Sequence, residues 1–538
     1  MNKEADSSPP VTQPATQPAS KRRFSFLSLS HTHSAFSATV LLGLSSLVSG
    51  LLALVRTKYV SYVFGAGAAT DAYTAAFQLP DMVGYFLVGG VASITLINIL
   101  SRHREAGDDA AGDEALSVVL MGMVAVLGVG IALAELAAPF YVRHFFPSFN
   151  ASTSALCIHL TRMLLPAQLF FFVGGVLGSR LLVRKVFFYQ ALTPIIYNLG
   201  IILGGVFLHR RVGIDSLAWG VLAGFFIGST VINAFGAFRD GLRFSPVLNL
   251  RHPAFVEWLR LSLPLMIGVS LVMADRWLLS YFASADPGGI YRLNVAKTLF
   301  NSPLSIIAVA AGMASLPFFS SLYAEGRTEE FNLAVCRSVS RLLAMALLVS
   351  AWLVPLAFPI VDLLKGGSFL RSDAISTAQY LSIFALSMAL WSAQGIYARA
   401  FYAAQNTLTP AVSGTIVTIV SIPVYWFLFH RFGVIGLAFA SNLGILAHTV
   451  ALAVLLHRSR LVSLAKLEWA EMGRAFAAAL AAMGAGYAVA RWMPHPAGHR
   501  GDLLLITAGT LAWALAALAI LTSLGSHLPA QMLRRKAG

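Results

Sequence analysis

Apolar segments of roughly 20 residues or more recur along nearly the whole chain and are separated by short polar connections. A transmembrane strand would instead show about 10 residues of alternating character. In lipid the backbone polar groups must be paired internally, and a helix does this within one segment. The pattern predicts an all-α polytopic membrane protein of fourteen spans, at 37–63, 72–100, 115–140, 155–182, 186–208, 215–238, 256–284, 289–322, 336–362, 374–402, 408–429, 434–457, 471–492 and 503–525.

Two of these spans interrupt the apolar pattern with polar residues at steps of three and four, which place them on one helical face. In and just before the span 72–100 these residues are Asp71, Thr74, Gln78, Asp81 and Tyr85. In the span 289–322 they are Asn294, Lys297, Thr298, Asn301 and Ser305. A charged side chain at the bilayer centre costs at least about 2.5–3.5 kcal/mol. Such faces are therefore expected to border a water-filled cavity or other helices.

Charged residues near the ends of the apolar segments have two interpretations each. Arg56 either lines the cavity or extends to the outer interface, as we expect for Lys58. Asp71 is either a cavity residue or, more simply, the N-cap of the helix after the Gly-Ala turn. The adjacent Asp275 and Arg276 either face the cavity or form a structural pair. Lys297 is expected in the cavity, because its own stripe is otherwise neutral.

Two short motifs occur twice, which predicts an internal repeat. GVAS at 90–93 returns as GMAS at 312–315, and LTP at 192–194 returns at 408–410, each six spans later. Equivalent spans then run in the same direction, a design known from transporters with two parallel halves. We predict a disordered tail (1–35), an N-lobe of six spans (36–250), a C-lobe of six spans (251–460), and two extra spans with a basic tail (461–538). The lobes are expected to enclose a central cavity bordered by spans 1, 2, 7 and 8.

The composition agrees with a membrane protein and excludes several other classes. Only 11% of the residues are charged and 57% are hydrophobic. The net charge of +15 is concentrated in connections and tails, where Lys and Arg orient a membrane protein, so no nucleic-acid partner is expected. There is no P-loop and no metal-binding spacing, so we expect neither an enzyme nor a metal or cofactor site.

At this point the residues resemble a known family. FGAGAATDAY (64–73) with the following Leu79-Pro80 is similar to the signature region of the MviN/MurJ lipid II flippases, within the multidrug/oligosaccharidyl-lipid/polysaccharide exporter superfamily. FYAAQNTLTP (401–410), ADRWLLSYFAS (274–284) and the fourteen predicted spans agree with that superfamily. The resemblance covers about residues 37–525. It implies alternating access of a cavity between two lobes in a bacterial inner membrane.

The resemblance also implies a substrate and a site. The family moves an undecaprenyl-pyrophosphate-linked peptidoglycan precursor to the outer leaflet, and cavity arginines engage its pyrophosphate. Arg56 matches one of these basic positions, whereas Ser49-Gly50, Gly84-Tyr85 and Ala296-Lys297-Thr298 stand where the family usually carries further arginines. The residues we expect to contact substrate are Arg56, Lys297, Arg276, Asn294, Asn301, Thr298 and Gln78. Structural or coupling candidates are Asp71, Asp81 and Asp275.

Three alternatives to a lipid II flippase stay open from the sequence. They are an exporter of another lipid-linked glycan, a cation-coupled drug antiporter using Asp71 and Asp81, and a non-transporting scaffold that binds cell-wall enzymes. The missing arginines favour the scaffold, whereas two lobes with a polar cavity favour a flippase. For a flippase we expect the lipid-linked glycan and membrane lipids as partners, with cell-wall synthesis enzymes as further ones. The driving force would be a coupling ion or the membrane potential.

The distribution of Lys and Arg predicts that both termini are cytoplasmic. The connections on the side of the N-terminus are richer in these residues than those on the other side. A reporter enzyme that works only in the cytoplasm should therefore be active when fused to either terminus. A reporter that works only outside the cytoplasm should be inactive at both. A terminus that reports from outside would contradict this topology.

Overall fold

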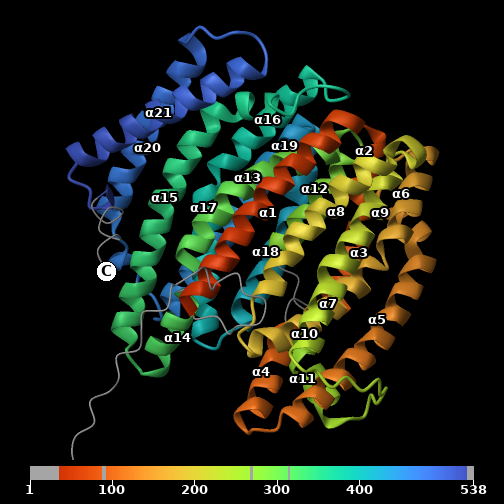
Figure 1. Cartoon of the computed structure of the whole chain (residues 1–538). Helices are drawn as coiled ribbons and strands as arrows, with labels where there is room; N and C mark the ends of the chain where they lie inside the picture. The colour runs from red at the N-terminus through yellow and green to blue at the C-terminus, as the bar shows by residue number, and fades with distance from the viewer. Residues whose placement is uncertain (1–34, 88–91, 267–270, 313–314, 530–538) are drawn as a thin grey trace, which may run out of the picture.

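The computed structural model describes residues 35–87, 92–266, 271–312 and 315–529, and this part of the chain contains helices and no strand (Figure 1). The helices before residue 250 are α1 (Ala35–Phe64), α2 (Ala68–Ala76), α3 (Gln78–Leu87), α4 (Ala92–Glu105), α5 (Asp109–Phe145), α6 (Ala151–Leu164), α7 (Ala167–Val183), α8 (Phe188–Val212), α9 (Asp215–Phe225), the π-helical η2 (Phe226–Val231) and α10 (Ile232–Arg239). The later ones are α11 (Pro253–Met266), α12 (Leu271–Ala283), α13 (Gly289–Gly312), α14 (Ser315–Ala324), α15 (Thr328–Asp362), α16 (Arg371–Leu386), α17 (Met388–Ala403), α18 (Leu408–Phe432), α19 (Val434–Arg458), the short η3 (Leu464–Lys466), α20 (Trp469–Trp492) and α21 (His499–Ser523).

The predicted spans coincide with these helices, and the all-α membrane fold is confirmed. Each of the fourteen predicted ranges matches one helix or a run of consecutive helices. Within the described residues, 10 helices are long and apolar enough to cross a membrane, or 11 if the bent pair α16 and α17 is one span. The remaining ranges are 72–100 and 289–322, which carry the polar stripes, and 256–284, which carries Asp275 and Arg276; each contains residues outside the described part. The number fourteen therefore stays a prediction.

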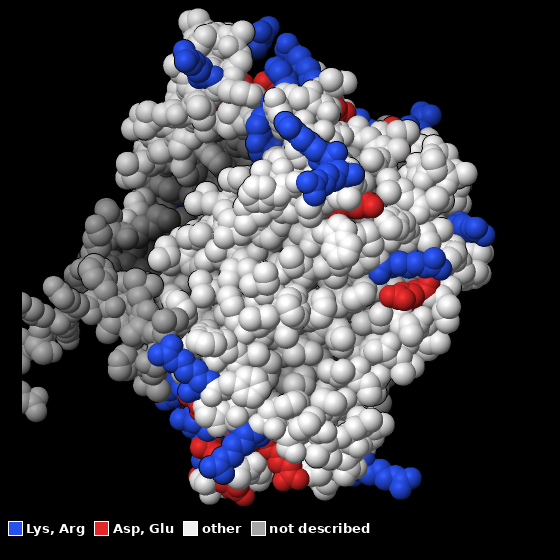
Figure 2. Space-filling view, turned by 45° about the vertical axis from the view of Figure 1, so that its right-hand side comes forward, with Lys and Arg blue, Asp and Glu red and all other residues white. Residues whose placement is uncertain are grey.

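The molecular surface has the charge distribution of a protein that crosses a membrane. On the face that Figure 2 shows, a broad central area is free of charged side chains, and most Lys, Arg, Asp and Glu lie toward the two ends of the molecule, with a few at the right edge. Large apolar side chains such as Leu136, Phe207 and Trp492 are more than 70% exposed. In water such exposure would be costly, but lipid chains are as apolar as these side chains.

Within each half, the helices pack against near neighbours in the sequence. In the first half α1 lies along α8, and α8 lies along α9. Gly200 and Gly204 of α8 face Gly220 and Gly224 of α9 so closely that an added Cβ at Gly200 would lie 2.7 Å from the Gly224 Cα. In the second half α15 packs against α16, α17, α20 and α21, which places the two extra C-terminal helices on the outside of that half (Figure 1).

One pair of helices is repeated in closely similar form, as the LTP motifs lead one to expect. Helices α8 and α18 are both 25 residues long, and each is followed by a glycine with positive φ. Gly213 has φ 59° and Gly433 has φ 63°, and both lead directly into the next helix. Half of the residues of the other repeated motif, GVAS and GMAS, lie outside the described part of the chain, as does nearly all of the predicted tail 1–35. The rotation that relates the two lobes stays a prediction.

The two halves meet along a seam at one end of the molecule, where the end of α1, the α1–α2 turn and the start of α13 converge (Figure 1). Ser368 makes two hydrogen bonds across this seam: its N–H donates to Tyr62 O (2.9 Å) and its hydroxyl donates to Val63 O (3.1 Å). Lys58 Nζ donates to Lys365 O at 2.8 Å. We call this set of contacts the closed seam.

Close approach at the closed seam explains the glycine in the segment FGAGA. Gly65 has φ 69°, and a Cβ there would lie 2.3 Å from the carbonyl oxygen of Ser368. Only glycine adopts this backbone conformation without strain. Gly65 is therefore needed where the first half touches Ser368 of the second half.

Replacing Gly65 with Ala should weaken the closed seam. We expect a lower midpoint of thermal unfolding than that of the Gly107→Ala variant, which has a matching φ of 74° but nothing within 4 Å of the added Cβ. Both variants carry the backbone penalty of about 1–2 kcal/mol, and only the first adds a collision between the halves. Equal unfolding midpoints for purified Gly65→Ala and Gly107→Ala would show that the seam contact contributes nothing.

Candidate functional site

Two adjoining pockets lie between the two halves. Their volumes are about 280 Å³ and about 150 Å³, and both are lined by Thr74, Arg276, Asn294 and Thr298. The larger is also lined by Gln78, Asp275, Leu279, Ser280, Ile290, Leu293, Lys297, Asn301 and Trp391. The smaller is also lined by Arg56, Thr57, Val60, Tyr73, Phe77, Tyr197, Tyr291 and Val295. We call the two together the interlobe cleft.

All seven residues that the sequence predicts to contact substrate line the interlobe cleft. They come from helices α1, α3, α12 and α13, which are parts of the predicted spans 1, 2, 7 and 8. On α13 the side chains of Asn294, Lys297, Thr298 and Asn301 point the same way because they are three or four residues apart. The structure thus brings together what the spacing predicted, while the roles of these residues in binding stay a prediction.

Lys297 is in the cleft but is already paired with acceptors from its own half. Its Nζ lies 3.0 Å from Asp275 Oδ2 and 3.0 Å from Ser441 Oγ. The rings of Phe384 and Trp391 lie 4.1 Å and 4.9 Å from it, measured to their centroids. The hydroxyl of Tyr425 donates to the same aspartate. Lys297 and Asp275, with side chains 16% and 6% exposed, therefore form a neutral and largely buried ion pair with its hydrogen bonds made, which is the condition for tolerating such a pair in an apolar site.

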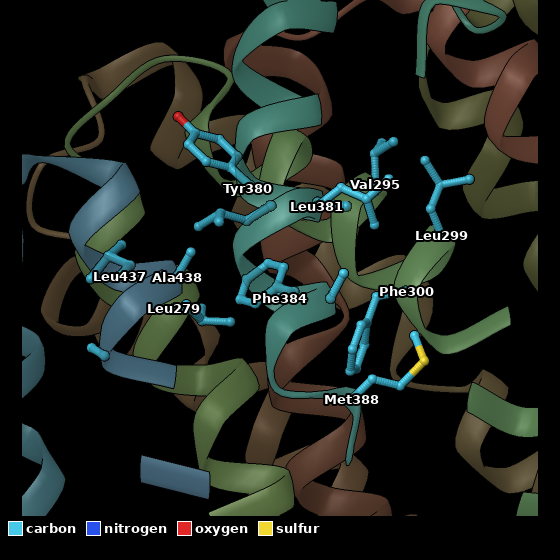
Figure 3. Packing of buried hydrophobic residues seen from close by; sticks show 14 of the residues in the cluster. Leu279, Val295, Leu299, Phe300, Tyr380, Leu381, Phe384, Met388, Leu437 and Ala438 are labelled. Atoms are coloured by element: carbon cyan, nitrogen blue, oxygen red, sulfur yellow. The ribbon is translucent and has the colours of Figure 1, made fainter. Parts of the chain in front are cut away.

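The surroundings of this pair are densely packed. Figure 3 shows Phe384 of α16 between Leu437 and Ala438 of α19 on one side and Phe300 of α13 on the other. Phe300 and Phe384 are fully buried. The low polarizability of such surroundings strengthens the attraction between Lys297 and Asp275.

Arg276 turns away from its sequence neighbour and binds the opposite half. Its Nη1 lies 3.1 Å from Asp81 Oδ2 of α3. Of the two interpretations of Asp275 and Arg276, the structural pair is not formed, because their side chains leave α12 in different directions and find partners on α13 and α3. The Arg276 side chain is 59% exposed, so this contact between the halves is weak and readily exchanged.

Arg56 has no carboxylate partner in the described part of the chain. It is half-buried at the wall of the smaller pocket, with its guanidinium 5.9 Å from the centroid of the Tyr197 ring. Of the two interpretations of this residue, the structure favours the cleft over the interface. Lys58, two residues on, instead lies at the closed seam.

Asp71 stabilises a different helix from the one we expected. The N-cap of α2 is Gly67, and Asp71 lies within the first turn. Its carboxylate accepts the backbone N–H groups of Gly288 (2.5 Å) and Tyr291 (2.8 Å), at the start of α13 in the other half. A carboxylate at a helix N-terminus satisfies free N–H groups and interacts with the helix dipole. The N-cap interpretation was wrong about the helix because sequence shows only local neighbours, and Asp71 instead joins the two halves.

Sequence reasoning missed the aromatic lining of the cleft. Tyr197 of α8 and Trp391 of α17 line it from spans that carry no polar stripe, and Tyr73 and Tyr291 line it near Arg56. The sequence signal for Tyr197 is weak, consisting of a polar Tyr-Asn pair inside an otherwise apolar span. Among the described residues no group of three or more His, Cys, Asp or Glu is placed to hold a metal ion.

Comparison with known families gives one extensive match. The family described as "Lipid II flippase MurJ" matches residues 60–509. A relative named "Probable lipid II flippase MurJ" from Bdellovibrio bacteriovorus is 27% identical over 447 residues, covering 78% of this chain and 81% of the relative. A protein of the same name from Thermotoga maritima is 26% identical over 426 residues, covering 78% and 85%.

Solved structures show the same fold. A structure described as "Lipid II flippase MurJ, inward closed conformation" has a TM-score of 0.74 at 21% identity, covering 90% of this chain and 99% of that one. An inward-facing multidrug transporter of the MATE family, in the MOP superfamily, has a TM-score of 0.61 at 17% identity, covering 79% and 98%. At these identities the likeness concerns the fold alone.

Removing Lys297 should expose the cost of the buried Asp275. We expect the Lys297→Met variant to lose about 3–5 kcal/mol of stability, because an unpaired carboxylate stays in an apolar site. The Asp275→Asn, Lys297→Met double variant should recover part of this loss, since neither side chain is then charged. Thermal unfolding of the purified variants in detergent measures both. A double variant no more stable than the single one would contradict a mainly structural role for the pair.

Proposed function

The chain belongs to the family of MurJ lipid II flippases, and on this premise we propose that it moves lipid II, the undecaprenyl-pyrophosphate-linked peptidoglycan precursor, from the inner to the outer leaflet. It is a membrane transporter and not an enzyme. The mechanism that fits the fold is alternating access, in which a cleft between two lobes opens to one side of the membrane at a time.

The observation that carries the proposal is the interlobe cleft with the side chain of Arg56 in its wall. A pyrophosphate that leaves water needs fixed cations, and charge-assisted hydrogen bonds are the strongest replacement for its hydration. Arg56 lacks a carboxylate partner among the described residues. Its planar guanidinium can bind a phosphate with two parallel hydrogen bonds.

The other two cations of the cleft differ in how readily a phosphate can recruit them. Arg276 is mostly exposed and holds Asp81 through one solvent-accessible contact, so a phosphate can replace that partner at little cost. Lys297 would have to leave Asp275, which would then remain buried and unpaired. We therefore propose Arg56 and Arg276 as the first phosphate contacts. The neutral donors Asn294 and Thr298 lie between them, and Lys297 serves mainly to hold the C-lobe together.

The contacts across the closed seam are of a kind that can break and reform. They consist of a few hydrogen bonds, including those from the start of α13 to Asp71, and of glycine contacts. If both termini are cytoplasmic, α1 runs outward and the closed seam lies at the outer face. A substrate that binds both Arg56 of the N-lobe and Arg276 of the C-lobe interacts differently with the two states, and only such a difference shifts their equilibrium.

Energy and partners follow from the same proposal. A coupling ion or the membrane potential would drive the cycle without a bound cofactor, and enzymes of cell-wall synthesis would supply or consume the lipid. These assignments rest on the family and on the transporter fold.

The proposal is tested in bacteria depleted of their own lipid II flippase. We expect the wild-type chain to restore growth, and the appearance of lipid II outside can be followed with an added lipid II-cleaving enzyme. Arg56→Ala should lose contacts worth about 1.5–3 kcal/mol, and flipping should fall about tenfold or more. Arg56→Lys should restore part of it, because lysine keeps the charge without the fork.

The matched control is Arg210→Ala, which removes an exposed arginine at the end of α8, outside the interlobe cleft. It should rescue as well as the wild type at equal membrane levels. Failure of the folded wild-type chain to rescue would favour another lipid-linked glycan, a drug antiporter or a scaffold. Normal flipping by Arg56→Ala would remove the phosphate role of Arg56.

A further inference from the structure

Two buried carboxyl groups face each other outside the interlobe cleft, near the closed seam. Asp362 is the last residue of α15 and Asp502 lies in the first turn of α21. They are 4% and 6% exposed. Helices α15 and α21 pack against each other, and the charge of Asp362 acts on the carboxyl group of Asp502. Within the described residues, Asp362 Oδ1 and Asp502 Oδ2 have no hydrogen-bond donor.

The groups that face this pair carry less positive charge than two carboxylates require. From the 363–370 turn, Lys365 Nζ lies 3.2 Å from Asp362 Oδ2. From α21 itself, His499 Nδ1 lies 3.6 Å from Asp502 Oδ2, and its side chain is 48% exposed. From α1, Lys58 interacts with Asp362 at longer range, while its ammonium is bound to the carbonyl of Lys365. One close lysine and the N-terminal turn of α21 can balance one negative charge but not two.

Two ionised carboxylates that lie close together in an apolar site, each with an oxygen that receives no hydrogen bond, repel strongly, whereas a shared proton replaces the repulsion with a hydrogen bond. A metal ion is a poor alternative, because among the described residues no group of three or more His, Cys, Asp or Glu side chains, His499 with this pair included, is placed to hold one, and Lys365 already brings a cation. We propose that Asp362 and Asp502 form a proton-binding site that holds one exchangeable proton, and that this proton stabilises the closed seam.

The 363–370 turn connects the proton site to the closed seam. Asp362 binds the side chain of Lys365, whose backbone carbonyl accepts the ammonium of Lys58 from α1. Three residues later the N–H of Ser368 donates to Tyr62 O. When the proton leaves, two negative charges compete for Lys365 and push the ends of α15 and α21 apart. The turn between them then shifts, and the contacts with α1 are lost.

The direction of the pH effect follows from this scheme. The closed state holds the proton, so low pH favours the closed seam and rising pH favours its opening. His499 contacts Asp502 and is half-exposed, so the pair can exchange its proton with water on that side.

The test measures the distance between the lobes and does not require transport. Spin labels at Arg211→Cys and Arg431→Cys, two exposed positions near the ends of α8 and α18, report on the two halves in lipid nanodiscs. The two natural cysteines are buried, which keeps them from being labelled. Between about pH 5 and 8 we expect the short-distance population to fall as the pH rises, by up to about tenfold in the closed-to-open ratio per pH unit.

The Asp502→Asn variant copies the protonated pair and keeps the bond between Asp362 and Lys365. We expect its short-distance population to stay at the low-pH level of the wild type throughout. The control is Asp109→Asn, which removes an exposed carboxylate paired with Arg184 in the N-lobe. It should titrate like the wild type. A wild-type distance distribution that does not change with pH, or an Asp502→Asn variant that titrates normally, would overturn the proposal.

Infrared difference spectroscopy tests the proton itself. Acidification of the wild-type protein should produce the C=O band of a protonated carboxyl group over the pH range of the distance change, and Asp502→Asn should lose it. If that variant does not fold, the absence of any such band from the wild type overturns the proton site. Neither measurement depends on lipid II, so this inference and the flippase proposal can fail separately.

Discussion

A charge in the apolar interior of this protein needs a partner, and the need for partners organises the region between the two halves. Lys297 and Asp275 satisfy each other within the C-lobe. Arg276 and Asp81 join the lobes through an exposed contact. Asp71 accepts the N–H groups at the start of α13. These three interactions differ in strength, because burial raises both the attraction between two opposite charges and the free-energy cost of separating them.

The interactions within a lobe are therefore stronger than the interactions between the lobes. The buried Lys297–Asp275 pair lies among the packed aromatic rings around Phe384 and is expensive to break. The contacts between the lobes are fewer: hydrogen bonds and glycine contacts at the closed seam, and the exposed Arg276–Asp81 ion pair in the interlobe cleft, which contributes little on its own. A protein built in this way can rearrange between its lobes without unfolding either of them. Alternating access requires the same property.

The structure also relates the C-terminal helices to the seam. Helices α20 and α21 lie on the outside of the second half, where a role in the central cleft is excluded by position. Helix α21 packs against α15, however, and the turn that follows Asp362 at the end of α15 binds α1. The extra helices thus have a physical connection to the contact between the lobes, through their packing against α15.

The sequence by itself determined the helical membrane fold, most helix positions and the polar residues of spans 1, 2, 7 and 8 that line the cleft. These follow from local rules, because apolar length sets the spans and a step of three or four residues sets a face. The partners were decided only by the tertiary structure. Lys297 looked like a free cation and is neutralised by Asp275, while Arg276 pairs with Asp81 and not with its neighbour. Asp71 looked like the cap of its own helix and caps α13. Charge pairing depends on distances between residues that are far apart in sequence, and no periodicity along one helix encodes those distances.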